Sequence, residues 1–174
     1  NLREADLTMT YLEGTYLSYA NLTYANLEDA VLSYADLYGA DLNYADLNDA
    51  NLWNASLISA DLSHADLTNA YLYYADLSGA YLSEADLTGA DLEDAVLSYA
   101  DLTNSSLNDA ELDDANLRYA DLINANLTGA YLENADLTGA DLTGADLTNV
   151  VWDWAICPDG TNAYYHEQNC ENNL

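Results

Sequence analysis

The 174-residue sequence is almost without positive charge, with 2 Lys and Arg residues against 31 Asp and Glu and a formal net charge of −29. Such a surface excludes direct nucleic-acid binding, because proteins hold the phosphate backbone through Lys and Arg. No apolar run approaches the roughly 20 residues of a bilayer-spanning helix, so we expect no membrane insertion. Because the sequence begins at Asn1 rather than Met, we expect a trimmed or processed chain, from which any targeting segment would already have been removed.

Residues that carry out chemistry are also scarce. The sequence has 2 His, His64 and His166, and 2 Cys, Cys157 and Cys170. Their spacing matches neither a zinc site nor a catalytic triad, so we expect no enzymatic activity, no metal site and no cofactor. Phe is absent and Met occurs once, yet 51% of the residues are hydrophobic. This fraction comes from Leu, Ala and Tyr, is too high for a disordered acidic tail, and indicates a core of monotonous composition.

Leucine is strictly periodic. It occupies every fifth position from Leu2 to Leu147, and Ala stands two residues earlier except at Thr10, Thr15 and Ser105. A five-residue period turns successive leucines about 140° apart on an α-helix, so no helix can bury them together. In a short extended segment, by contrast, the Ala and Leu of one repeat point to the same side.

The position two after each Leu predicts a turn in every repeat. It holds seven of the 8 glycines and eleven Asn or Asp residues, which are residue types that tolerate a positive φ. An extended pair, a corner and the next pair then build a solenoid whose coils stack through backbone hydrogen bonds. Because Leu and Ala fill its interior, we expect any function to lie on the outer faces or at the ends.

Runs such as Ala40-Asp41-Leu42-Asn43-Tyr44 and Ala140-Asp141-Leu142-Thr143-Gly144 resemble the cyanobacterial type of pentapeptide-repeat protein. The resemblance covers residues 1–154. It implies an all-β fold, the right-handed quadrilateral β-helix, with four repeats per coil. About 7.5 coils of 20 residues, roughly 36 Å in length, would follow. Residues 155–174 would then form a C-terminal cap or tail.

The end of the sequence departs from the repeat, although Trp152 and Cys157 keep the leucine register. Trp152, Trp154 and a turn at Pro158-Asp159-Gly160 suit a cap over the last coil. A disulfide between Cys157 and Cys170 would stabilise this cap by roughly 3 kcal/mol.

The Cys-Pro-Asp-Gly-Thr…Cys ending resembles that of exported cyanobacterial members of the family. It implies an extracytoplasmic location, namely the periplasm, the exterior or the thylakoid lumen. At the other end, Asn1 is already in register. This leaves three possibilities open: shielding by Arg3 to Tyr11, a chain that continues upstream, or an end-to-end dimer.

Residues 20 apart become vertical neighbours in this fold, so the acids form columns such as Asp46, Asp66 and Asp86. Like charges about 5 Å apart cost about 0.8 kcal/mol even in water. Two interpretations stay open. Either the carboxylate before each Leu accepts hydrogen bonds from turn amides, or the columns bind Ca²⁺ or Mg²⁺ weakly and without specificity.

One outer face, built from the third repeat of each coil, changes along the solenoid from aromatic to acidic. The exposed aromatics could simply stack on one another, as on other β-solenoids. Alternatively, the face binds an unknown protein or a cationic partner. The candidate binding residues are Trp53, Tyr71, Tyr73, Tyr74, Asp91, Glu93, Asp94, Glu111, Asp113 and Asp114.

The resemblance also implies an alternative function, because acidic members of the family mimic DNA and bind a type II topoisomerase (gyrase). The density of carboxylates, about one per 1.3 Å against about one per 1.7 Å for duplex DNA, permits this. Those mimics, however, carry Phe at the central position and a dimerising C-terminal module.

A third option is ice or mineral binding by rows such as Thr68 and Thr88, which Asn108 interrupts. We therefore expect a non-enzymatic extracytoplasmic scaffold or protein-interaction module.

Overall fold

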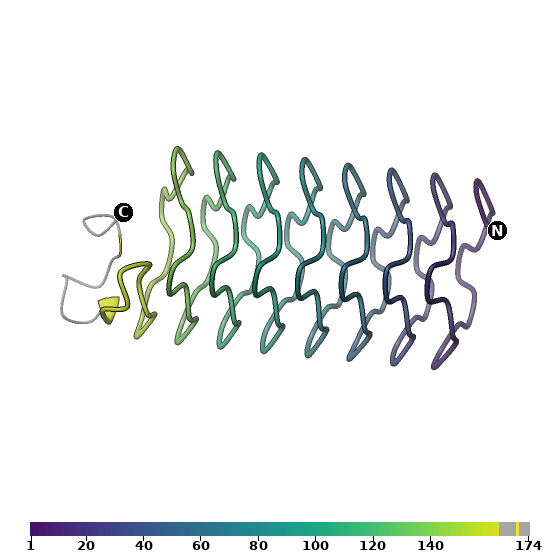
Figure 1. The fold of residues 1–174 in the computed structure, drawn as a ribbon, viewed down its shortest axis with the longest axis horizontal. Helices are drawn as coiled ribbons and strands as arrows, with labels where there is room; N and C mark the ends of the chain where they lie inside the picture. The colour runs from purple at the N-terminus through teal and green to yellow at the C-terminus, as the bar shows by residue number, and fades with distance from the viewer. Residues whose placement is uncertain (164–169, 171–174) are drawn as a thin grey trace.

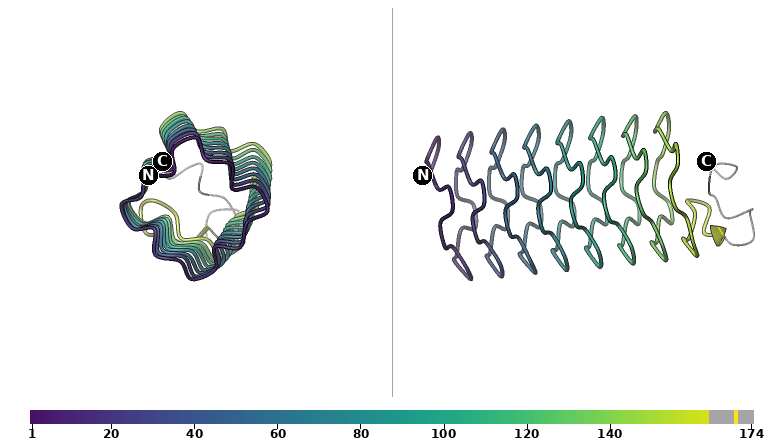
Figure 2. Two further views of the ribbon diagram at one scale, coloured as in Figure 1. Left: turned by 90° about the vertical axis from the view of Figure 1, so that its right-hand side faces the viewer. Right: turned by 180° about the vertical axis from the view of Figure 1, so that it is seen from behind.

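The computed structural model, which describes residues 1–163 and 170, is an elongated solenoid. Seen end-on it has a four-sided outline (Figures 1 and 2). Parallel bridges join residues 20 positions apart, from the pair Asp6 and Asn26 to the pair Asp136 and Ile156. Each bridge involves one residue, and the described part contains no α-helix and no continuous strand. The predicted all-β solenoid with a 20-residue repeat is confirmed.

The coils are joined by a hydrogen-bond pattern that repeats in each pentapeptide of the interior coils. The Leu N–H donates to the next coil, as Leu42 does to the carbonyl of Asp61 at 2.7 Å. The residue before it donates to the preceding coil, as Asp41 does to the carbonyl of Ala20 at 2.9 Å. The Ala N–H closes the turn, as Ala45 does on the carbonyl of Leu42 at 2.9 Å. The backbone is thereby paired without long strands.

The Asp or Asn before each Leu satisfies a further N–H, that of the residue after the Leu. Oδ1 of Asp66 accepts the N–H of Thr68 at 2.9 Å and its hydroxyl at 2.6 Å. Asp141 accepts the same two bonds from Thr143, at 2.9 and 2.5 Å. The hydrogen-bond interpretation of this position is confirmed, and these bonds offset the repulsion within the acidic columns. They hold the pKa of Asp141 below its usual value, the Thr143 hydroxyl contributing most.

The turns place the second residue after every Leu in the left-handed region, with φ from 53° at Asn54 to 75° at Gly144. The predicted corners are confirmed. Seven of these residues are Tyr, and the sequence contains no local reason for Tyr to adopt a positive φ. At Gly139 a Cβ would lie 2.5 Å from the ring of Tyr119. Glycine there serves the backbone and also leaves room for that ring.

Leu and Ala side chains fill the interior. From Leu22 to Leu137 every leucine of the register is 0% exposed, and the alanines between them are at most 1% exposed. Where Ala is replaced, the hydroxyls of Thr10, Thr15 and Ser105 donate to the Leu carbonyl three residues earlier, at 2.6, 2.6 and 2.7 Å. The polar substitutions therefore do not leave these hydroxyl donors without an acceptor.

The chain reverses direction after the last coil. The N–H of Cys157 donates to the carbonyl of Thr161 at 2.7 Å, and Cys157 forms the expected disulfide with Cys170. Trp152 and Cys157 are both buried, so the leucine register continues to residue 157. Part of the predicted tail, with His166, lies outside the described residues.

Candidate binding face

The third-repeat residues do form one face of the solenoid. Bridges connect Asn51 to Tyr71, Tyr71 to Asp91, and Asp91 to Glu111. The same repeats contain two further columns, one of residues 53, 73, 93 and 113 and the other of residues 54, 74, 94 and 114. We call these residues, from Asn51 to Asp114, the mixed face. It brings the ten candidate residues together on four successive coils, in the order that the 20-residue period predicts.

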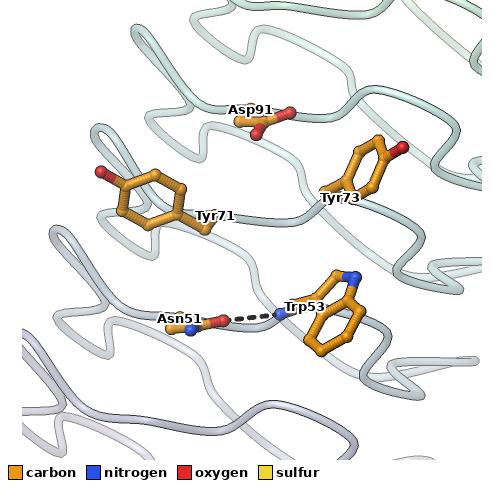
Figure 3. A pocket seen from close by; sticks show the side chains of 5 residues that line it. All are labelled: Asn51, Trp53, Tyr71, Tyr73 and Asp91. Atoms are coloured by element: carbon orange, nitrogen blue, oxygen red, sulfur yellow. Dashed lines mark hydrogen bonds between the residues drawn. The ribbon is translucent and has the colours of Figure 1, made fainter.

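The mixed face contains a hollow with a volume of about 310 Å³, lined by Asn51, Trp53, Tyr71, Tyr73 and Asp91. Asn51, Tyr71 and Asp91 follow one another on successive coils along one side of it, and Trp53 and Tyr73 lie on the other side (Figure 3). Asn51 was missed by the sequence analysis, although its place one coil before Tyr71 was a usable signal. Its Oδ1 accepts the N–H of Trp53 at 3.0 Å.

The aromatic rings of the mixed face do not form a continuous stack. Trp53 meets Tyr34 at a ring-centroid distance of 4.8 Å and an interplanar angle of 61°. Tyr73 and Tyr74 are 4.2 Å apart and tilted by 52°. Within the part of the chain that the structure describes, Tyr71 contacts no other ring, and it is 54% exposed. Ring surface therefore remains available to a ligand.

The opposite face of the coil, built from the first repeat, behaves differently, and there the stacking interpretation holds. Tyr24 and Tyr44 are stacked at 5.0 Å and 4°, and Tyr44 and His64 at 4.5 Å and 7°. His64 Nδ1 lies 3.3 Å from a carboxylate oxygen of Glu84. The rings of this column stack on one another along the solenoid axis, and His64 belongs to it as one more surface residue.

The acids of the mixed face lack basic partners. Across residues 1–163 and 170, Asp91, Glu93, Asp94, Glu111, Asp113 and Asp114 form no ion pair. The two arginines pair elsewhere, Arg3 with Glu4 at 3.0 Å and Arg118 with Asp136 at 2.8 Å. The mixed face therefore keeps its negative charge.

Crowding changes the ionisation of two residues on this face. Partial burial, followed by the charges of Asp91 and Asp94 and of the next coil, raises the pKa of Glu93. A hydrogen bond with Tyr74, then burial and nearby charge, raises the pKa of the Tyr73 hydroxyl. Tyr73 is thereby kept neutral and the pair of rings is held in place.

Lowering the pH from about 7 to the unfolded pKa of Glu, about 4.3, is expected to raise the melting temperature. Because the pKa of Glu93 is raised in the folded state, the folded protein takes up this proton first. The gain begins as the pH falls through that folded pKa, and it is complete below the unfolded value of about 4.3. At still lower pH, the stability that Asp141 and Asp146 contribute is lost as the pH falls through their lowered folded pKa values.

Circular-dichroism melts between pH 2 and 7 measure this profile. Residue 93 of the Glu93→Gln variant carries no charge at any pH, so the melting temperature of the variant is expected to rise less than that of the wild type as the pH falls from 7 to about 4.3. Identical profiles for the two proteins in that interval would contradict the assignment to Glu93.

Two classes of site find no counterpart in residues 1–163 and 170. No group of three or more His, Cys, Asp and Glu side chains there could hold a metal ion. The same residues include no helix that is long and apolar enough to cross a bilayer. The carboxylates of the acidic columns accept turn hydrogen bonds, as at Asp66.

Comparison with known proteins gives the relatives of this chain. It is 35% identical to HetL, a pentapeptide repeat protein involved in heterocyst differentiation regulation from the cyanobacterium Nostoc sp. strain PCC 7120, over 90% of this chain and 82% of that one, with a TM-score of 0.45. A pentapeptide repeat protein from the Arabidopsis thaliana thylakoid lumen is 28% identical, over 57% of this chain and 66% of that one, with a TM-score of 0.45.

The plasmid-mediated fluoroquinolone resistance protein QnrB1 is 17% identical over 88% of this chain and 79% of that one, with a TM-score of 0.55. This likeness concerns the fold alone. No curated protein sequence gave a match. The family model for pentapeptide repeats matches in 8 copies over residues 1–33, 35–72, 75–114 and 110–149. The chain therefore belongs to the pentapeptide-repeat family.

Proposed function

We propose that this chain is a non-enzymatic, extracytoplasmic protein-interaction module whose mixed face binds a basic partner protein. The observation that carries this proposal is the hollow where aromatic coils give way to acidic ones. Trp53, Tyr71 and Tyr73 supply contact area, and Asp91 begins a run of six acids without basic partners. Aromatic anchors give affinity at protein interfaces, and complementary charge steers the encounter.

The architecture supports a binding role over a catalytic one. The interior is filled by Leu and Ala, as at Leu62 and Ala65, which are 0% and 1% exposed. The outer faces are held by hydrogen bonds within each coil and between neighbouring coils. A rigid face needs little ordering when a partner binds, which lowers the entropic cost of association.

Replacing Tyr71, Tyr73 and Tyr74 with Ser is expected to abolish partner capture and leave the fold intact. The three rings lie outside the core, and truncating interface aromatics of this kind costs about 2 kcal/mol or more each, or at least about 30-fold in affinity. Immobilised protein captures partners from an extract of the native host. Each captured protein is then purified, and its affinity for the wild type and the variant is measured.

The matched control is the variant in which Tyr99 and Tyr119 become Ser. These two rings are stacked at 5.1 Å on another face. A partner of the mixed face binds this control as it binds the wild type. Undiminished binding to the Tyr71, Tyr73 and Tyr74 variant would refute the proposal, and so would equal losses in both variants.

We infer the extracytoplasmic location from the disulfide between Cys157 and Cys170, since such bonds persist in oxidising compartments. The inference extends to the organisation of the chain, with a β-helix over residues 1–154 and a cap or tail over 155–174. It also includes the right-handed sense and the roughly 7.5 coils that stacking at about 4.8 Å implies. A crystal structure of the full chain checks the organisation, the handedness and the number of coils.

A second candidate function is DNA mimicry toward a type II topoisomerase, which the net charge of −29 favours. The disulfide speaks against it, because an oxidising compartment would keep the protein from a cytoplasmic enzyme. A gyrase supercoiling assay decides the matter. Inhibition at micromolar protein would support mimicry, and the absence of any effect would exclude it.

A further inference from the structure

The hollow on the mixed face combines exposed rings with a carboxylate that has no basic partner. We propose that it holds the side chain of an arginine from the partner protein, with the guanidinium against the rings of Trp53 and Tyr71 and with Asp91 as its counter-ion. This inference rests on the proposed function, because it names the residue that anchors the partner.

The size of the hollow suits one side chain. Its volume of about 310 Å³ stands at the lower end of the roughly 300–1,000 Å³ of sites for whole small molecules. The rings stand on both sides of it, and Asp91 lies one coil beyond Tyr71 (Figure 3). A long, flat-headed side chain that enters between the rings would reach the carboxylate with its tip.

The two arginines of this chain show how a guanidinium binds to its tyrosines and acids. Each of its two arginines lies over a tyrosine ring, Arg3 5.4 Å from the centroid of Tyr24 and Arg118 5.6 Å from that of Tyr119. Each also pairs with a carboxylate, Arg3 with Glu4 and Arg118 with Asp136. At two places on the surface of this chain, a tyrosine ring and a carboxylate together thus bind a guanidinium.

The hollow repeats this combination without an arginine of its own. Tyr71 is 54% exposed and Trp53 39%, and Asp91 forms no ion pair with any described residue. Oδ1 of Asp91 accepts the N–H of Glu93 at 3.2 Å, and Oδ2 has no hydrogen bond within the described part of the chain. A partner must therefore supply the cation.

Three properties favour arginine over other occupants. A guanidinium is planar, stacks on aromatic faces and sheds water more readily than the ammonium of lysine. An apolar side chain would desolvate Asp91 without compensation. A neutral sugar would stack on the rings but would gain nothing from the six acids that begin at Asp91.

Two peptides of equal charge test the proposal, acetyl-Arg-Gly-Lys-Gly-Lys-amide and its analogue with Lys in place of Arg. Calorimetric titration of the full chain at low salt is expected to give about fivefold tighter binding of the arginine peptide, in line with a cation–π contribution of about 1 kcal/mol. In the Trp53→Leu, Tyr71→Leu double variant the ratio is expected to fall to about one. In Asp91→Asn it is expected to fall to about twofold.

Tyr99→Leu, on another face, is the matched control and keeps the fivefold ratio. Melting curves establish that each variant is folded. A ratio below about twofold in the wild type, or an unchanged ratio in the double variant, overturns the proposal. Competition by the neutral sugar maltohexaose with unchanged affinity at high salt would overturn it in favour of carbohydrate. Normal binding of a partner captured through the mixed face, together with equal affinity for the arginine and lysine peptides, would support the proposed function and refute the proposed arginine anchor.

Discussion

Leu82→Ala is expected to destabilise the protein by about 2–5 kcal/mol, the range for truncating a buried leucine that leaves a cavity. Leu82 is 0% exposed, and so are Leu62 and Leu102, which occupy the same register position one coil away on either side. The cavity cannot collapse readily, because the backbone around it is fixed by hydrogen bonds to both neighbouring coils. Guanidinium chloride unfolding followed by circular dichroism measures the loss.

Leu7→Ala is the matched control for this experiment. Leu7 occupies the same position of its repeat but is only half-buried. The same truncation there removes less buried area and opens no enclosed cavity, so the loss is expected to be about 1 kcal/mol. Equal losses at the two positions would mean that the interior does not pack as the burial of Leu82 indicates.

Removal of the disulfide has the second largest expected effect. The variant with Ser at residues 157 and 170 is expected to lose about 3 kcal/mol, as the loop-closure model gives for a loop of this length. The bond joins residues 13 apart and holds the reversed chain against the last coil, where Ile156 bridges Asn162 in antiparallel fashion. Thermal melts with and without a reductant measure the difference.

The loss is expected to be local, because each coil of a solenoid contacts only its neighbours. Hydrogen exchange after reduction is expected to accelerate from Val150 to Ala163 and to stay unchanged from Leu62 to Leu102. Intact mass after alkylation, with and without reduction, establishes that the bond is present in protein from the native host. Uniform acceleration along the chain would contradict this view of the cap, and free thiols would remove the argument for an oxidising compartment.

Much of the fold follows from one period in the sequence. A leucine every five residues cannot belong to a helix or a long strand, and the residues at the turn position account for the corner. The preference for Asp or Asn before each Leu also had a physical reason that could be stated in advance, and the bond from Thr68 to Asp66 confirms it.

Other features of the fold could not be read from local preferences. Tyrosine is unusual at a positive φ, yet Tyr44 adopts it at 59°. The reason is tertiary, because its ring stacks on Tyr24 one coil before and on His64 one coil after. Ser105 likewise occupies an alanine position because its hydroxyl finds a carbonyl inside the turn.

The candidate site was predictable in outline. The 20-residue register places Trp53, Tyr71 and Asp91 on one face before any coordinates are known. The hollow itself depends on how the rings tilt, and the sequence does not contain that information. Asn51 was overlooked for the same reason, since its importance comes from lining the hollow rather than from its residue type.

The 20-residue register also determines how this protein can change by insertion and deletion of coding sequence. Gaining or losing one whole coil keeps every downstream residue on its own face and alters only the distance along the axis, by about 4.8 Å. Gaining a single pentapeptide between Tyr74 and Asp91 would preserve the core equally well, but it would turn all later faces by one side. The acids from Asp91 to Asp114 would then lie around the corner from Trp53 and Tyr71. The fold would tolerate both changes, whereas a binding surface built from several coils would tolerate only the gain or loss of a whole coil.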